Sequence, residues 1–207
     1  EGFDKIFKEL MCDEIISGGQ TMNPSTQDLY EAVEKIDAKN VFILPNNKNI
    51  IMAAEQVNEL SDKNVYVVPT KTIPQGFMAM LSFDETKSPE ENLNDMTESL
   101  STIKTGQVTY AIRDTEMNGL VIKKDDYIGI MDGNIVAVSD SPEKLVSELI
   151  DRNIDDETSL ITVYGGDGIK EEQFDGLKEE LESKYTDFDV DFEMGNQPTY
   201  FYIFSIE

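Results

Sequence analysis

The sequence predicts an α/β protein of two subdomains, an N-terminal parallel, Rossmann-like α/β sheet and a C-terminal mixed-sheet α+β unit. The apolar runs Val41–Leu44 and Val65–Val68 are each followed by a proline and a helical pattern, as in strands buried in a parallel sheet. Later strands instead alternate or flank the hairpin signal Asp132-Gly133. The turn-like Ser82–Pro89 predicts a boundary, giving subdomains 1–86 and 87–207.

The first half reads as alternating helices and strands. In order, we expect a helix over 1–11, a strand at Ile15-Ile16, a polar loop over 17–26, a helix over 26–38, a strand over 41–44, a helix over 50–60, a strand over 64–68 and a helix over 73–81. The carboxyl ends of parallel strands meet at one edge, where ligands bind in such sheets. We therefore expect Ser17–Thr26, Pro45–Asn49 and Pro69–Gly76 to gather there.

The second half begins with a helix through Leu93, Met96 and Leu100, which we expect to pack between the halves. The remaining elements are predicted to be strands over 107–113, 127–131 and 134–139, a helix around Leu145 and Leu149, a strand over 159–164, a helix around Leu177, a strand over 188–194 and a strand over 200–206. The last strand is apolar almost throughout, so it should lie at the centre of its sheet.

The loop from Ser17 to Thr26 concentrates glycines and uncharged hydrogen-bonding side chains in an acidic chain. One interpretation is a capped turn, in which Ser25 and Asp28 satisfy the free N–H groups of the following helix. The other is a ligand- or partner-facing loop. Its candidate residues are Gly18, Gly19, Gln20, Thr21, Asn23, Ser25 and Thr26, joined at the same edge by Asn46, Asn47 and Gln75.

The formal charge of −25, from 42 acidic and 17 basic residues, argues against nucleic acid, anionic membrane surfaces and polyanionic ligands, and favours a basic protein partner. The chain has no histidine, so His-dependent hydrolase chemistry and zinc sites are not expected. Its single cysteine excludes an intrachain disulfide and fits a cytoplasmic protein. No apolar run is long enough to span a membrane.

Three further segments have both a structural and a functional interpretation. Gly165-Gly166-Asp167-Gly168 follows a strand but completes no phosphate-binding pattern, so we interpret it as a turn. Arg113 is one of two arginines; it either pairs with Asp114 or Glu116 or makes an interdomain or partner contact. The uncharged turn containing Gln197 is either a tight connection or a second polar loop on the same crevice as Ser17–Thr26.

The motifs Gly18–Thr26, Leu44–Asn47 and Ile73–Gly76, with the ending Gly195–Pro198, resemble the C-terminal region of the ATP-binding subunit of bacterial fatty-acid kinases, the dihydroxyacetone-kinase-like family. This resemblance implies a separate N-terminal kinase domain that holds Mg-ATP, with no cofactor and no metal in this domain. It also implies that the domain docks an acyl-binding protein of the DegV family. Because Glu1 is not an initiator methionine, we expect a fragment of a longer chain.

The order of elements is also similar to that of DegV proteins themselves, which implies the two-subdomain DegV-like architecture. Those proteins carry a histidine before the last strand, where this chain has Gln197-Pro198-Thr199. The leading hypothesis is therefore a non-catalytic docking domain of a fatty-acid kinase. The alternative is a lipid- or small-ligand-binding domain that uses the interdomain crevice. Whether the domain also pairs with a second copy is left open.

Overall fold

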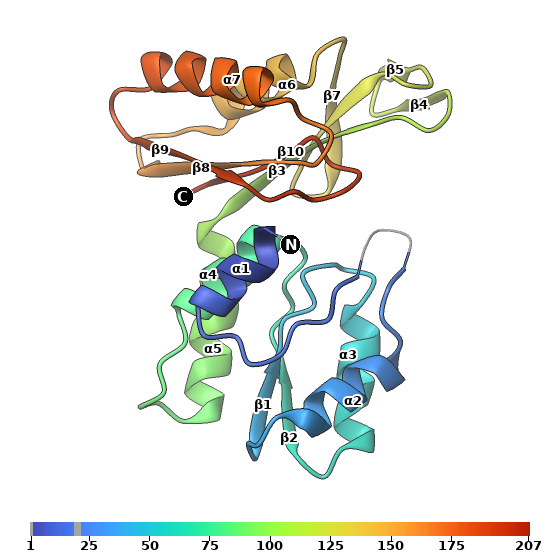
Figure 1. The fold of residues 1–207 in the computed structure, drawn as a ribbon, viewed down its shortest axis with the longest axis vertical. Coiled ribbons are helices and arrows are strands. Elements are labelled where there is room, and N and C mark those ends of the chain that lie inside the picture. The colour runs from blue at the N-terminus through green and yellow to red at the C-terminus, as the bar shows by residue number, and fades with distance from the viewer. Residues whose placement is uncertain (1, 19–21) are drawn as a thin grey trace. The chain divides into compact units, whose positions relative to one another are not determined.

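A computed structural model describes residues 2–18 and 22–207 (Figure 1). The chain forms two compact units, the N-terminal unit Phe3–Ile103 and the C-terminal unit Lys104–Glu207 with Gly2, which are described separately. This division lies later in the chain than the predicted boundary after residue 86. The reason is that helix α5 (Pro89–Ser99) packs against α4 (Ile73–Leu81) and the second strand of the N-terminal unit, burying Met96 beside Val68 and Ala79.

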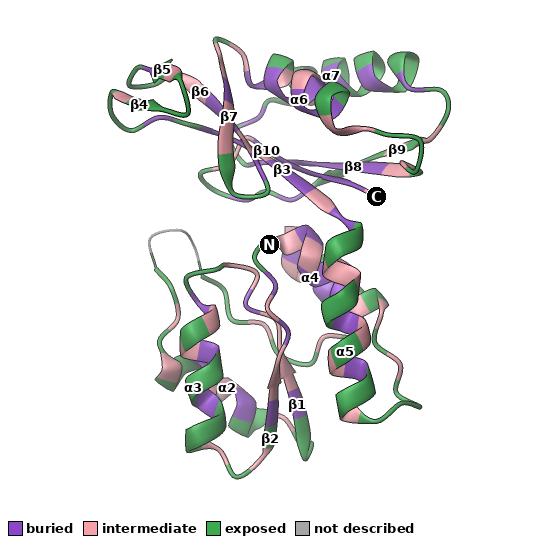
Figure 2. Cartoon of the chain, turned by 180° about the vertical axis from the view of Figure 1, so that it is seen from behind, coloured by how far each residue is buried: buried purple, intermediate pink, exposed green. Residues whose placement is uncertain are grey.

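The N-terminal unit is a two-stranded parallel sheet covered by helices on both faces (Figure 2). Besides α4 and α5 it contains α1 (Gly2–Glu9), α2 (Thr26–Lys35), β1 (Asn40–Ile43), α3 (Ile51–Leu60), β2 (Asn64–Val67) and a 3-10 turn (Leu100–Thr102). Val41 lies opposite Val65, and both pack with Val33 and Val57 of α2 and α3. Phe42, on the opposite face of β1, packs against the cluster of α4 and α5.

The predicted strand at Ile15-Ile16 is wrong, because the described segment around it has no strand. Ile16 is exposed and only two apolar residues stand between acidic and glycine-containing neighbours, so little apolar surface favours pairing there. The parallel sheet therefore has two strands. Helix α2 also ends earlier than expected, since Ile36 adopts an extended backbone after Lys35.

Two helices of the N-terminal unit begin with capping boxes. The Ser25 hydroxyl accepts a hydrogen bond from the Asp28 backbone N–H, while the Asp28 carboxylate accepts from the Ser25 hydroxyl at 2.7 Å and from its backbone N–H at 2.8 Å. These donors favour the ionised carboxylate and lower the pKa of Asp28. Ser88 and Glu91 form the same arrangement at α5. The predicted capped turn before α2 is thus confirmed.

The C-terminal unit is built on a six-stranded mixed sheet in the order β7-β6-β3-β10-β8-β9. Its elements are β3 (Lys104–Tyr110), β4 (Thr115–Met117), β5 (Leu120–Ile122), β6 (Tyr127–Met131), β7 (Asn134–Ser139), α6 (Pro142–Asn153), β8 (Leu160–Gly165), α7 (Glu171–Lys184), β9 (Asp189–Met194) and β10 (Tyr202–Ile206). Only β8 and β9 pair in parallel. Helices α6 and α7 cover one face of the sheet (Figure 1), where they pack on Tyr202 and Phe204. The predicted central position of the last strand is confirmed.

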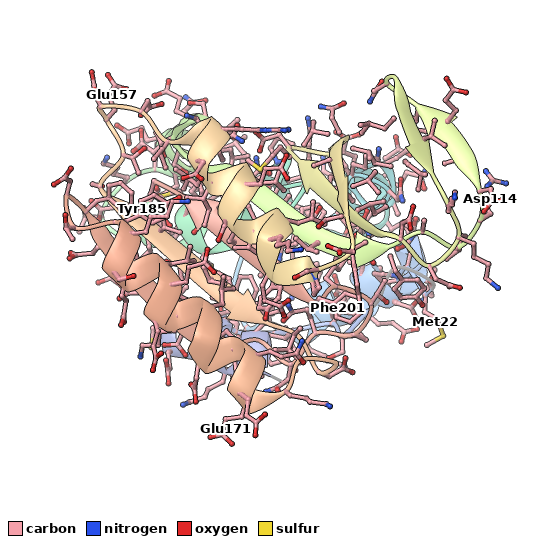
Figure 3. The ribbon with its side chains drawn as sticks, turned by 90° about the horizontal axis from the view of Figure 1, so that it is seen from above. Met22, Asp114, Glu157, Glu171, Tyr185 and Phe201 are labelled. Carbon is pink, nitrogen blue, oxygen red and sulfur yellow. The ribbon has the colours of Figure 1, made fainter. Side chains whose placement is uncertain are left out.

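A small hairpin, which the sequence did not predict, extends from this sheet. Strands β4 and β5 pair only with each other, and we call residues 111–126 the β4–β5 arm (Figure 3). Strand β3 ends at Tyr110, so the predicted strand over 107–113 is too long. The backbone pairs between Ala111 and Asp125 or Asp126 anchor the arm, and Ile122 is buried on its inner side.

Packing around the central strand gives a first prediction. A methyl group at Gly106 of β3 would collide with the Phe204 ring, so Gly106→Ala should lower the free energy of unfolding by about 1–3 kcal/mol. The matched control is Gly176→Ala in α7, where the added methyl group meets no atom within 4 Å. Because alanine favours a helix interior, this control should raise stability by about 0.5–1 kcal/mol. Urea unfolding of both variants checks the pair; destabilisation of both by the same amount contradicts the packing described.

The capping box gives a second prediction. Ser25→Ala removes the cap of α2 and should cost about 1 kcal/mol at neutral pH, whereas Ser17→Ala, exposed before the helix, should change stability by less than about 0.5 kcal/mol. A carboxylate with a lowered folded-state pKa stabilises above its ordinary range and loses that contribution as the pH falls through the folded pKa. The difference between wild type and Ser25→Ala should therefore shrink in acid. An unfolding series over pH measures it, and a difference that grows in acid contradicts the cap.

Candidate functional site

The loops that follow β1 and β2 meet the segment before α2 at one edge of the N-terminal unit, which confirms the expected gathering. The backbone N–H of Asn46 donates to the Thr70 hydroxyl at 2.9 Å, which ties the two strand-following loops together. The side-chain amide of Asn47 donates to the Asn23 side-chain oxygen at 3.4 Å, which joins the loop before α2 to the loop after β1. Parallel pairing of β1 and β2 places these segments side by side.

Asn46 has an unusual backbone and an unsatisfied side chain. Its φ of 55° is left-handed, a conformation that asparagine tolerates better than most residues. Its side-chain amide lies directly against Gly76, where any Cβ would collide with it, so this contact requires glycine. The Asn46 Oδ1 atom is buried without a hydrogen-bond partner among the described residues. A buried unpaired amide oxygen is costly, so a donor from water or a bound molecule would stabilise this edge.

Other predicted residues at this edge complete local structure. Gln75 Oε1 accepts from the Lys71 backbone N–H at 2.8 Å, and the Gln75 backbone N–H donates to the Thr72 hydroxyl at 3.3 Å, so Gln75 closes the start of α4. Asn47 Oδ1 accepts from the Asn49 backbone N–H at 2.9 Å. These contacts hold the loops but leave surface on their outer side.

The loop before α2 is partly described. The Thr26 hydroxyl donates to Gln56 Oε1 of α3 at 3.0 Å, which attaches the loop to the second helix. Gly18 lies close to the Met22 carbonyl and to Pro24. Ser25 is the α2 cap described above. The candidates Gly19, Gln20 and Thr21 lie outside the described residues.

This edge differs from the rest of the chain in its charge. Residues 16–27, 44–54 and 68–83, which we call the acid-free edge, contain no aspartate or glutamate. Acids make up 42 of the 207 residues, so 39 residues of average composition would carry about eight. The charged side chains of the acid-free edge are Lys48 and Lys71, both exposed, and neither has an ion-pair partner in the part of the chain that the structure describes.

The acid-free edge also exposes flexible apolar side chains. Met22 is 77% exposed and points away from the ribbon (Figure 3), and Met52, in the first turn of α3, is 72% exposed. Met52 lies one helical turn before Gln56, the residue that bonds Thr26, so it lies on the side of α3 that faces the loop. Methionine adapts to irregular surfaces and is common at binding sites. The edge thus combines amides, hydroxyls, two lysines and exposed methionines.

Arg113 and Gln197 belong to the C-terminal unit. Arg113 is exposed in the β4–β5 arm and forms no ion pair with Asp114 or Glu116; the Asp114 carboxylate instead accepts from the Lys124 backbone N–H at 2.7 Å. The predicted ion pair is therefore wrong. Gln197 is 6% exposed, and its Nε2 donates to the Tyr164 carbonyl at 3.1 Å, while its Oε1 is buried without a partner among the described residues.

The glycine-rich loop after β8 is a structural turn, as expected. The Gly166 N–H donates to the Phe201 carbonyl at 2.8 Å and the Asp167 N–H to the Gln197 carbonyl at 3.1 Å, so neither is free to bind phosphate. Within the described ranges, no three His, Cys, Asp or Glu side chains are grouped to hold a metal ion. In the same ranges, every helix is too short or too polar to cross a membrane.

Sequence reasoning missed Thr70, Lys48, Lys71 and the methionines as parts of this edge. Thr70 is fully buried and supports Asn46, a contact between residues 24 positions apart that no local motif announces. The absence of acids was visible in the sequence, but in three separate segments. Counting acids over the three segments together, once they were predicted to share an edge, would have identified the lysines.

The sequence and the fold place the chain among known proteins. Residues 1–207 match the FakA-like C-terminal family, which is the C-terminal region of the A-type subunit of fatty acid kinases. Protein YloV of Bacillus subtilis is 40% identical over the whole chain, and an uncharacterized protein of Staphylococcus aureus is 41% identical. The chain covers 37% and 38% of these two proteins, so it spans less than two-fifths of the length of the relatives it matches.

Solved structures show the same fold at low sequence identity. A DegV family protein from Corynebacterium glutamicum has a TM-score of 0.68 at 14% identity, covering 98% of this chain and 92% of that protein. The Streptococcus pneumoniae Fatty Acid Kinase B3 protein, loaded with linoleic acid, has a TM-score of 0.63 at 12% identity, covering 99% and 83%. The predicted DegV-like architecture is confirmed, and the chain belongs to the FakA-like C-terminal family of fatty acid kinases.

Proposed function

We propose that this domain is a non-catalytic docking module of a fatty-acid kinase. It binds an acyl-loaded protein of the DegV family and presents it to a separate kinase domain. That kinase domain, with Mg-ATP, phosphorylates the carboxylate of the bound fatty acid. In this proposal the kinase domain belongs to the part of the longer relatives that this chain does not span, and the assembly works in the cytoplasm.

One observation carries the proposal: a chain of the FakA-like C-terminal family has, over its whole length, the fold of DegV proteins. Membership of the family connects the chain with fatty-acid kinases. Fold alone does not assign a function, so the role rests on the residues present. Those residues favour binding over phosphoryl transfer, because the glycine-rich loop uses its N–H groups internally and Glu171 and Glu172 occupy the first turn of α7.

The third prediction tests docking. Titrating the domain with a lipid-loaded DegV-family protein in a calorimeter should give saturable binding with a Kd below about 50 μM. The same DegV protein stripped of lipid and an unrelated acidic protein of similar size serve as controls. Absence of heat and of complex formation at about 50 μM of each partner would overturn the docking role.

A second candidate function, binding of a lipid or small ligand by the domain itself, is favoured by Asn46. Its buried amide oxygen at the acid-free edge has no partner among the described residues and could accept a hydrogen bond from a ligand. The solved structures named above provide the precedent in fold, since one of them is loaded with linoleic acid.

The fourth prediction separates the two candidates. If the domain only docks, native mass spectrometry of the purified protein should give the mass of the bare chain after incubation with a long-chain fatty acid. A DegV-family protein treated in parallel is the positive control and should retain the acid. A retained acyl chain on the domain, lost in the Asn46→Ala variant, would favour the second candidate instead.

A further inference from the structure

We propose that the acid-free edge is the docking face, and that it receives a patch of the DegV-family partner in which acidic side chains flank an apolar centre. This inference rests on the proposed function, because it names the surface used for the docking proposed above. Three properties of the edge support it: its charge, its side-chain chemistry and its anchoring. The β4–β5 arm is the competing surface.

Charge gives the first argument. With a net charge of −25, most of the surface repels an acidic protein, and close contact between like charges opposes association. The acid-free edge is free of this repulsion over three segments that the fold brings together. Lys48 and Lys71 are available there, since they have no ion-pair partner in the described part of the chain. The nearest acid along α2, Asp28, is occupied by the Ser25 cap.

Side-chain chemistry gives the second argument. The cores of protein interfaces are depleted of charged residues and enriched in methionine and aromatic residues, with a polar rim. The acid-free edge matches this pattern, because Met22 and Met52 supply exposed apolar contact area and the two lysines can serve as a charged rim. Asn47 and Asn23 add hydrogen-bonding groups between them. A partner with carboxylates around an apolar patch complements both features.

Anchoring gives the third argument. A docking face binds best when its groups are held in place before the partner arrives. Here Asn46 is fixed by its bond to the buried Thr70, Thr26 is bonded to α3, and Gln75 closes the start of α4. The loops are therefore held by the rest of the N-terminal unit, while the methionines and lysines remain exposed.

The β4–β5 arm is also exposed and apolar, with Ile112 at 77% and Val121 at 70% exposure. Its charges are mixed, however. Val121 lies directly across the hairpin from Glu116, and four acids in residues 111–126 outnumber three bases. An acidic partner is repelled as much as attracted there, so this surface fits the proposed partner less well.

The fifth prediction compares two variants with the same net charge. The edge variant carries Lys48→Glu and Lys71→Glu, and the arm variant carries Lys123→Glu and Lys124→Glu; all four lysines are exposed. Each variant lowers the net charge by the same amount, so non-specific repulsion changes equally. At about 150 mM salt, the edge variant should weaken binding of the lipid-loaded DegV protein by about tenfold or more, and the arm variant by less than about threefold. Circular dichroism and urea unfolding confirm that both variants fold.

Each outcome has a distinct meaning. Equal weakening by the two variants indicates a general charge effect and overturns the docking face, as does wild-type affinity in the edge variant. Stronger weakening by the arm variant transfers docking to the β4–β5 arm and also overturns this inference. In all these cases the wild-type domain still binds, so the proposed function survives. Only failure of the wild-type domain to bind refutes the proposed function itself.

Discussion

The parallel pairing of β1 with β2 is the constraint on which the candidate site depends. Two strands that run in the same direction end at the same edge, and each ends close to a proline that stops the pairing. The chain must then cross back through a helix, so the loops after both strands start side by side. The bond from Asn46 to Thr70 fastens these loops, and Gly76 leaves room for the Asn46 amide. Loss of the pairing would separate every group at the edge.

The uneven distribution of charge explains how such an acidic domain can have a binding face. A net charge of −25 describes the average surface and sets solubility and long-range repulsion. It says little about a local surface, because exposed charges more than about 10 Å apart are largely screened at physiological salt. The acid-free edge is such a local exception. The same reasoning limits the argument from net charge against anionic partners, since two unpaired lysines lie at this edge within the described part of the chain.

Much of the fold was predictable from the sequence, for physical reasons that differ between elements. The hairpin of β6 and β7 was predicted with its bounds, because Asp132-Gly133 specifies a tight turn between two apolar runs. The capping of α2 was predictable because Ser25 and Asp28 are neighbours in sequence. Strands β4 and β5 were not, since three residues each give no measurable alternation. The division at residue 103 depends on how α5 packs, and the contact between Asn46 and Thr70 on tertiary structure; neither is written in a local pattern.

The central claim is that the acid-free edge contacts the acyl-binding partner. Hydrogen–deuterium exchange of the domain, alone and with a lipid-loaded DegV-family protein, tests it without any substitution, because backbone amides covered by a partner exchange more slowly. The account predicts new protection in peptides from residues 16–27, 44–54 and 68–83, with residues 111–126 unchanged. Protection confined to residues 111–126 or to α6 and α7, with unchanged exchange at the acid-free edge, would contradict it.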